Sequence, residues 1–333
     1  MDPRLTVNSS YTVNDIHPCY EIDQKSYVLT RKTTIMCVLL NVFLGLLAVV
    51  TTCGNLLVII SIIYFKQLHT STNYLILSLA VADLLVGVLD FPLGMAFTVT
   101  SCWYHEDLFC KVRSIFDVAL CQASIFHLCC VSVDRYYAVC HPLLYKSKIN
   151  DRVIGIMVFV SWGIPALIGI STINAGFNKT NCDEGCLLDA LLSTTVGSIF
   201  LFYIPVILML SIYLKIFFIA KRQANSIQET ICQSTKSRIT VSKMERKATK
   251  TLAIVLGVFL LCWTPFFLCI IFQPLTYDVT PISVVEIFNC LAMVNSMLNP
   301  FIYAFFYSQF RSAFRVLISV KIFQGDFSNI QLL

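Results

Sequence analysis

Long apolar stretches separated by short polar links dominate the pattern of this chain. Seven such stretches lie at about 34–64, 72–98, 107–139, 153–175, 190–219, 249–273 and 281–305. Each is long enough to cross about 30 Å of hydrocarbon as an α-helix. No internal repeat, soluble domain or linker rich in Pro, Gly and Ser interrupts the series. The pattern predicts an all-α fold, a seven-transmembrane helix bundle with a short amphipathic helix near the carboxyl terminus.

The composition also indicates a membrane protein. Hydrophobic residues make up 57% of the chain and charged residues 13%, and the mean hydropathy is +0.77. A soluble globular domain has a more polar composition. We expect an extracellular amino-terminal segment at 1–33, the membrane domain at 34–305, and a cytoplasmic amphipathic helix and tail at 306–333.

Lys and Arg residues predict the orientation, because they concentrate in cytoplasmic loops. The fifth link, the second link and the tail are rich in them: Lys221, Arg222, Lys236, Arg238, Lys243, Arg246, Lys247, Lys146, Lys148, Arg152, Arg311 and Arg315. The amino terminus is then extracellular, as are the glycosylation sequons at Asn8 and Asn178. The net charge of +5 fits an anchor to anionic membrane lipids and not a nucleic-acid site.

Asp117 and Arg135 lie eighteen residues apart in the third stretch. That is five helical turns, so the two side chains share a face about 27 Å apart along the axis. Asp117 follows Phe116 and precedes Val118, and we expect no basic residue nearby in sequence. An ionised Asp117 then needs an incoming cation as its partner. The alternative is an Asp117 that is protonated or that accepts from hydroxyl groups.

Motifs in all seven stretches resemble those of rhodopsin-like G-protein-coupled receptors. They are Asn55 in Gly-Asn-Leu-Leu-Val, Asp83 in Leu-Ala-Val-Ala-Asp, Asp134-Arg135-Tyr136, Trp162, Pro205, Cys262-Trp263-Thr264-Pro265 and Asn299-Pro300-Phe301-Ile302-Tyr303. Within that class, the run from Asn295 to Phe310 resembles the trace-amine-associated receptor signature. Gln309 departs from the signature, because that family usually has Trp there. The resemblance covers about 35–320.

The resemblance implies a plasma-membrane receptor for a small cationic amine, and not an enzyme. It implies that Asp117 is the counter-ion of a ligand ammonium. It also implies an olfactory or trace-amine role, with signalling through a heterotrimeric G protein of the stimulatory class. The implied activation switch comprises Asp134, Arg135, Tyr136, Tyr213, Trp263, Pro265, Pro300 and Tyr303.

A second polar layer should lie deeper in the bundle. Its members are Asp83, Asn55, Ser124, Asn295, Ser296 and Asn299. Oxygen ligands around a carboxylate suit a hard cation, and the resemblance implies a sodium ion held by Asp83. A water-filled hydrogen-bond network without metal is the alternative. We expect no other cofactor.

Two further acids bear on the choice of amine. Asp90 and Asp117 each lie seven residues outward from the polar layer, or about 10 Å above it. Glu286 lies nine to thirteen residues outward, or roughly 14–20 Å above it. An extended diamine such as cadaverine or putrescine would bridge Asp117 and Glu286. Two alternatives remain open. Glu286 is exposed to bulk water and binds no ligand, or Asp90 is the second acid; Asp90 itself either has that role or accepts a hydrogen bond from a nearby hydroxyl.

The other candidate ligand residues are Trp263, Phe266, Phe267, Phe202, Met293 and Ser198. Their aromatic rings offer apolar and cation–π contacts, while the fifth stretch lacks the run of serines of catechol-binding relatives. This favours aliphatic amines. A monoamine receptor, or an orphan receptor for a peptide or lipid, is the alternative. A retinal photoreceptor is excluded because 280–305 contains no lysine for a Schiff base.

Fifteen cysteines divide by predicted depth. Most lie inside the apolar stretches and should act as small apolar fillers, whereas Cys19, Cys102, Cys110, Cys182 and Cys186 fall on the outer, oxidising side. A Cys110–Cys186 disulfide would hold the long outer loop over the bundle, and a Cys19–Cys182 disulfide would hold the amino-terminal segment there. Sequence does not decide the connectivity. A zinc site is the alternative.

Overall fold

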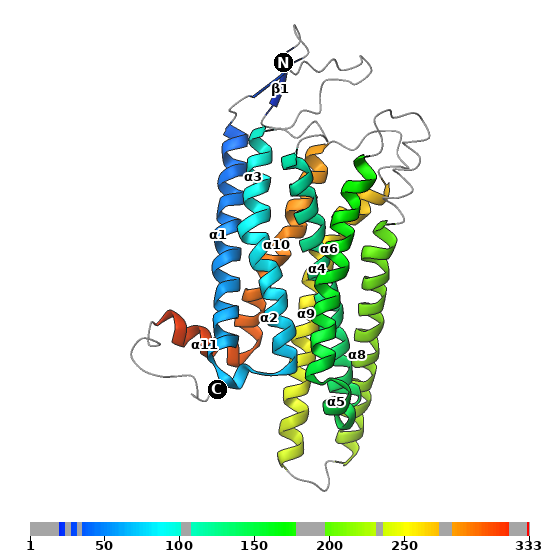
Figure 1. Ribbon diagram of the computed structural model, residues 1–333. Helices are drawn as coiled ribbons and strands as arrows, with labels where there is room; N and C mark the ends of the chain where they lie inside the picture. The colour runs from blue at the N-terminus through cyan, green and yellow to red at the C-terminus, as the bar shows by residue number, and fades with distance from the viewer. Residues whose placement is uncertain are drawn as a thin grey trace.

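The computed structural model describes residues 20–23, 28–31, 35–100, 108–177, 197–230, 236–272, 282–319 and 332. The elements shown in Figure 1 are β1 (Tyr20–Asp23), β2 (Val28–Arg31), α1 (Ile35–Tyr64), η1 (Lys66–Leu68), α2 (Ser71–Leu85), η2 (Val86–Asp90), α3 (Phe91–Thr100), α4 (Leu108–Cys140), α5 (Pro142–Lys148), α6 (Asp151–Phe177), η3 (Ile199–Tyr203), α8 (Ile204–Thr230), α9 (Lys236–Phe272), α10 (Ile282–Phe306) and α11 (Ser308–Ile318).

Seven helical segments within the described residues are long and apolar enough to cross a membrane. The second is continuous from α2 through the π turn η2 into α3, and the fifth begins with the π turn η3. Large apolar side chains point outward from the bundle, among them Phe159 (76% exposed) and Leu261 (75% exposed). Such a surface is stable in lipid and not in water. The predicted seven-span helix bundle is confirmed.

Three local elements go beyond the prediction. The fifth link, which lies between the predicted stretches 190–219 and 249–273, is mostly helical, since α8 continues to Thr230 and α9 begins at Lys236. A short helix, α5, follows the third span and has Pro142 in its first turn, where proline is favoured. β1 and β2 form an antiparallel hairpin whose register pairs Tyr20 with Arg31. These elements lie outside the apolar stretches, and hydrophobicity therefore gave no signal for them.

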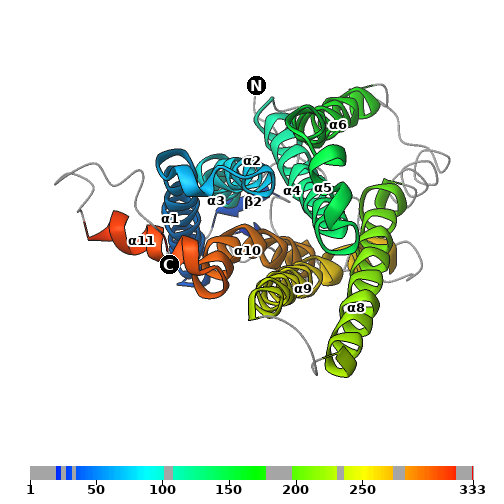
Figure 2. The same ribbon diagram turned by 90° about the horizontal axis from the view of Figure 1, so that it is seen from below.

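The long helix α4 occupies the centre of the bundle. It packs against α2, α6, α8 and α9, while α10 packs against α1 and α9. Figure 2 shows this arrangement along the bundle axis. The hairpin and α11 lie at opposite ends of the bundle (Figure 1), which we call the hairpin end and the α11 end.

A polar network joins three helices within the apolar core. Trp162 Nε1 of α6 donates to Ser78 Oγ of α2 at 2.9 Å. Ser78 Oγ lies 2.7 Å from His127 Nε2 of α4, and His127 Nδ1 lies 2.7 Å from the Ala123 carbonyl oxygen. Because a carbonyl only accepts, His127 carries its proton on Nδ1 and accepts from Ser78 at Nε2. These bonds help to hold α2 and α6 against the central helix.

The helix α11 has the amphipathic character predicted for it. Phe310 and Phe314 are buried against the α11 end of the bundle, where Phe310 lies 5.6 Å from Tyr303 between ring centroids. Arg311 and Arg315, on the other face, are exposed. A helix of this kind lies along a membrane interface.

Candidate functional site

Asp117 lies near the hairpin end of α4, partly buried. Its carboxylate is hydrogen-bonded to the Asn289 side chain of α10 and interacts electrostatically with the Arg113 guanidinium. The expectation that no basic residue is near Asp117 in sequence is wrong. Arg113 precedes Asp117 by four residues, a spacing that places both on one helix face.

Asp90 ends the π turn of the second span and is only 1% exposed. Neither carboxylate oxygen has a hydrogen-bond partner among the described residues, so the hydroxyl partner considered for it is not found there. Its carboxylate interacts electrostatically with Asp117 and with Arg113. The structure therefore brings together two of the three predicted acids and adds a guanidinium to them.

The third acid, Glu286, belongs to α10, but its side chain lies outside the described residues. The same holds for the side chain of Cys110, and for Cys19, Cys102, Cys182, Cys186, Asn8 and Asn178. The second-acid role of Glu286, both disulfides and both glycosylation sites therefore stay predictions. Seven thiols described within the helices are free, those of Cys53, Cys121, Cys129, Cys130, Cys140, Cys262 and Cys269.

Four of the predicted ligand residues form one aromatic group on the fifth and sixth spans. Phe202 stacks on Phe267 with ring centroids 4.0 Å apart, and Phe267 lies 5.9 Å from Trp263 and 5.4 Å from Phe266. Met293 belongs to a different cluster, in which Phe116 is a member. Ser198, which is 6% exposed, immediately precedes the π turn η3. The aromatic group can offer ring faces to a ligand cation or its alkyl chain.

The deeper polar layer is centred on Asp83, which is fully buried. Its carboxylate accepts hydrogen bonds from Ser124 Oγ at 3.1 Å, from Asn299 Nδ2 at 2.7 Å, and from the Ser296 side chain. Asn55 Nδ2 donates to the Ser296 carbonyl oxygen at 3.1 Å. Five of the six predicted members are therefore linked to one another.

Spare oxygen atoms remain in this layer. The side-chain oxygens of Asn55, Asn295 and Asn299 are buried without a hydrogen-bond partner in the described structure. A carboxylate, hydroxyls and amide oxygens are ligands that suit a hard cation such as sodium. Among the described residues, no group of three or more His, Cys, Asp or Glu side chains is arranged so that it could hold a metal ion. The residues present fit the predicted sodium ion, and they fit an ordered water network equally well.

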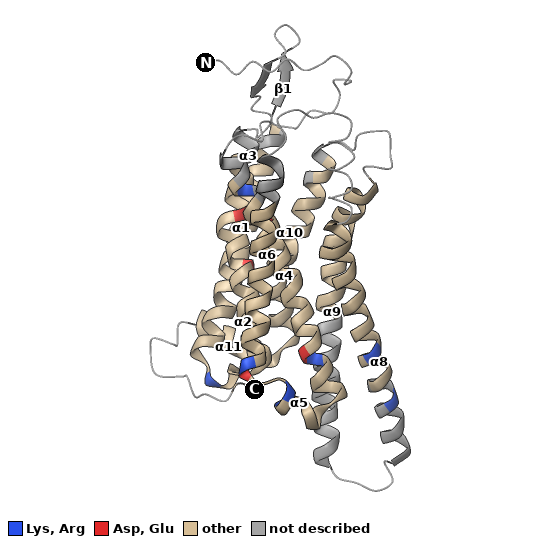
Figure 3. Cartoon of the chain, turned by 45° about the vertical axis from the view of Figure 1, so that its right-hand side comes forward, with Lys and Arg blue, Asp and Glu red and all other residues tan. Residues whose placement is uncertain are grey.

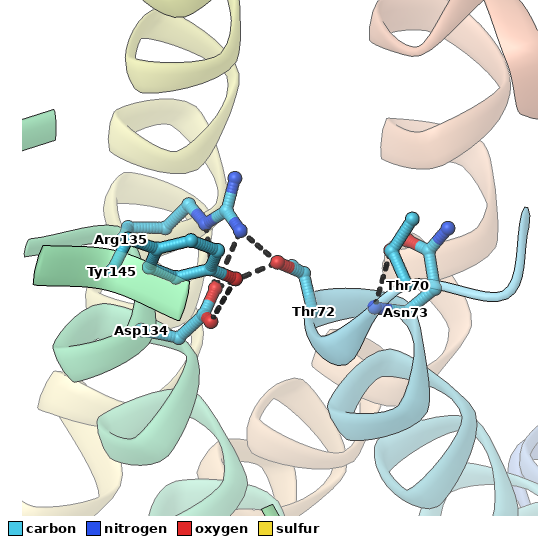
Figure 4. Close-up of polar contacts among 6 residues, drawn as sticks. All are labelled: Thr70, Thr72, Asn73, Asp134, Arg135 and Tyr145. Carbon is cyan, nitrogen blue, oxygen red and sulfur yellow. Dashed lines mark hydrogen bonds and ion pairs between the residues drawn. The ribbon is translucent and has the colours of Figure 1, made fainter. Parts of the chain in front are cut away.

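The Asp134–Arg135 pair lies at the α11 end of α4. Asp134 is fully buried, and it accepts from Arg135 Nε at 2.8 Å, from Thr72 Oγ1 at 2.7 Å and from the Tyr145 hydroxyl at 2.8 Å (Figure 4). Arg135 also donates to Thr72. Thr72 is placed in the first turn of α2 because Thr70 caps that helix. Thus α2, α4 and α5 are joined through one carboxylate.

Burial and the Asp134 charge raise the pKa of the Tyr145 phenol above its ordinary value of 10.0. The hydroxyl therefore keeps its proton at physiological pH and serves as a donor. With two further donors on Asp134, the buried negative charge is well compensated by hydrogen bonds.

Comparison with known proteins places the chain in a family. A family model described as 7 transmembrane receptor (rhodopsin family) matches residues 54–303. The chain is 41% identical to Trace amine-associated receptor 1 of Macaca mulatta, over 87% of this chain and 90% of that protein. It is 39% identical to Trace amine-associated receptor 8b of Rattus norvegicus, over 98% of this chain and 99% of that protein. This chain is a trace-amine-associated receptor.

The receptor is therefore a multi-pass membrane protein of the rhodopsin-like G-protein-coupled class and not an enzyme. Membership of the trace-amine-associated receptor family implies, in general terms, an amine ligand and a G-protein partner. Two of the predicted switch residues, Asp134 and Arg135, form an ion pair in the structure.

The other predicted switch residues have separate surroundings. Tyr136 lies beside His141, with its hydroxyl 3.4 Å from His141 Nε2, and does not bond Arg135 in the described structure. Tyr213 is hydrogen-bonded to Ser132 and interacts electrostatically with Arg135. Tyr303 is 3% exposed. Trp263 belongs to the aromatic group, and Pro265 and Pro300 lie inside α9 and α10.

Four residues of the receptor's sites are not among those predicted from the sequence. The four-residue spacing between Arg113 and Asp117 is a sequence signal that identifies Arg113 as a neighbour of that acid. Asn289 is a polar residue in the last span, yet nothing in sequence joins it to Asp117. Thr72 and Tyr145 reach Asp134 from two other helices, and only tertiary packing brings them together.

Proposed function

We propose that this receptor binds a biogenic amine at the hairpin end through Asp117 and activates a stimulatory G protein at the α11 end. Asp117 carries the proposal. Its partly buried carboxylate is held by Asn289 beside a second acid, Asp90, so that two negative charges face one guanidinium. A ligand ammonium adds the missing positive charge together with charge-assisted hydrogen bonds.

The distribution of basic residues supports an orientation with the hairpin end outside the cell. Figure 3 shows most of the described Lys and Arg positions near the α11 end. Lys146, Lys148, Arg152 and Arg311 are exposed there, as expected for cytoplasmic segments of a plasma-membrane protein. The α11 end then presents Arg135 to the G protein.

The preferred ligand is a diamine such as cadaverine or putrescine, because its second ammonium can bind a second acid of the site. Glu286 and Asp90 are the candidates for that acid, and the Asp90 carboxylate has no hydrogen-bond partner among the described residues. The aromatic group of Phe202, Trp263 and Phe267 suits an alkyl chain better than a catechol. We assign the receptor a trace-amine or olfactory role because of its similarity to its relatives. We also assign a sodium ion to the polar layer around Asp83.

A cyclic-AMP assay tests this function. Cells expressing the receptor are exposed to monoamines and diamines of increasing chain length, with surface expression measured in parallel. Asp117→Ala should reduce amine potency by about 100-fold or more, the loss expected when a charge-assisted contact is removed. Asp151→Asn, which alters an exposed acid at the α11 end, is the matched control. Unchanged amine potency in Asp117→Ala would overturn the proposal.

A further inference from the structure

Asp90 is placed by an unusual turn of the second span. The π turn Val86–Asp90 changes which face of the helix the following residues occupy. Gly87, within this turn, packs closely on α1, and a Cβ there would lie 2.7 Å from Thr52 Oγ1. A glycine at this position lets the wide turn sit against its neighbour. Asp90 at the end of the turn is buried in the bundle and not turned to lipid.

Asp90 and Asp117 lie at the same depth on adjacent spans. The hydrogen bond from Ser124 Oγ to Asp83, at 3.1 Å, fixes a common level for α2 and α4. Each of the two outer acids is seven residues further toward the hairpin end, about 10 Å along the axis. Their carboxylates accordingly interact electrostatically.

The two acids differ in what the protein supplies to them. Asp117 has a hydrogen bond from Asn289, whereas Asp90 has none among the described residues and is 1% exposed. Arg113 provides positive charge to both. A buried carboxylate without hydrogen bonds is costly, and in native proteins such a group is usually satisfied by a bound ligand, ion or water or has a functional role.

We propose that Asp90 is the second acid of the amine site and binds the second ammonium of a dicationic ligand. The inference rests on the proposed amine function and transfers to Asp90 the role predicted for Glu286. A short alkyl diamine places one ammonium at Asp117 and the other at Asp90, where its N–H groups supply the absent hydrogen bonds. The chain between them crosses from α4 to the second span at one level of the bundle.

The first experiment compares mono- and diamine potency in Asp90→Asn, a variant that keeps the shape of the side chain and removes its charge. Diamine potency should fall by about 10-fold more than monoamine potency, because only the diamine loses a charge-assisted hydrogen bond, which contributes roughly that much. Glu286→Gln should keep the diamine preference of the wild-type receptor. Equal losses for both ligand types in Asp90→Asn, or loss of the preference in Glu286→Gln, would overturn the assignment.

A second variant keeps the charge and decides the matter if Asp90→Asn fails to reach the cell surface. Asp90→Glu lengthens the side chain by one methylene group and so moves the carboxylate further from its own helix, toward the ligand. The most potent member of a diamine series should then become shorter by about one methylene. An optimum that stays at the same chain length contradicts a direct contact between Asp90 and the ligand.

Failure of this inference is separable from failure of the proposed function. If Asp117→Ala abolishes all amine responses while the Asp90 variants respond as the wild-type receptor does, the amine function stands and only the assignment of Asp90 falls. If Asp117→Ala leaves every response intact, the amine function itself is wrong.

Discussion

Asp134 and Asp90 are both buried aspartates, but they differ in the number of hydrogen bonds that the described residues donate to them. Asp134 is 0% exposed and accepts hydrogen bonds from Arg135, Thr72 and Tyr145. Asp90 is 1% exposed and receives none from the described residues. A buried carboxylate with its own donors holds a structure together, whereas one without them is poised to gain from a partner. Burial alone therefore does not distinguish a structural acid from a ligand-binding one.

The two regions are far apart on the same helix. Asp117, beside Asp90, and Asp134 are seventeen residues apart on α4, about 26 Å along the axis. An amine at the hairpin end consequently cannot touch the Asp134 cluster, and any coupling must pass through helix movement. The Asp83 layer lies between them with only part of its oxygen atoms hydrogen-bonded. Like Asp134, the Asp83 carboxylate accepts hydrogen bonds from the protein. Like Asp90, the layer also contains buried oxygen atoms without a hydrogen-bond partner among the described residues.

The largest effect is expected from Asp134→Ala. This change leaves the Arg135 guanidinium, 18% exposed, without its carboxylate, a loss of about 3–5 kcal/mol for a buried ion pair broken on one side. The thermal midpoint of the purified receptor should fall and its basal cyclic-AMP signal per surface receptor should rise. Asp151→Ala, at an exposed site near the same end, should change neither. If Asp134→Ala has the stability and basal signal of the wild-type receptor, the Asp134 carboxylate does not stabilise the packing of α2, α4 and α5.

Asp83→Asn tests the intermediate case. In the wild-type receptor, added sodium chloride should weaken amine binding by about 10-fold, a typical coupling between two sites, and potassium chloride at equal ionic strength should not. The variant keeps the shape of the side chain but loses the charge that a cation requires, so this sodium effect should disappear. Identical sodium and potassium titrations of the wild-type receptor would favour the water network instead.

The span pattern could be predicted because it depends on the sequence of each helix alone. Apolar length gave all seven spans, and amphipathic spacing gave α11. The Asp83–Ser124–Asn299 cluster also follows from depth along three spans, once the spans are arranged as in the family that the chain resembles.

The side-chain partnerships across helices could not be predicted in the same way. Thr72 is one hydroxyl among many, and its contact with Asp134 depends on how α2 packs against α4. Tyr145 contributes from α5, a helix too short and polar to appear in a hydrophobicity pattern. The π turn before Asp90 likewise has no simple sequence signal, although it decides where that carboxylate lies.

Tyr145→Phe makes the smallest change and sharpens the contrast most directly. It removes one of the three donors to Asp134 and leaves the ring in place, at a cost of about 1 kcal/mol. Since burial raises the pKa of Tyr145, the lost group is a neutral donor throughout the physiological range. Basal cyclic-AMP should rise by a few-fold, less than in Asp134→Ala, with amine potency unchanged or slightly increased.

Tyr137→Phe is the matched control for this change. Tyr137 packs in the same cluster as Tyr145, but its hydroxyl is not among the donors to Asp134. If the two phenylalanine variants raise the basal signal equally, ring packing and not the hydrogen bond restrains the α11 end. If only Tyr145→Phe raises it, the restraint depends on how completely the Asp134 carboxylate is hydrogen-bonded, the property that Asp90 lacks.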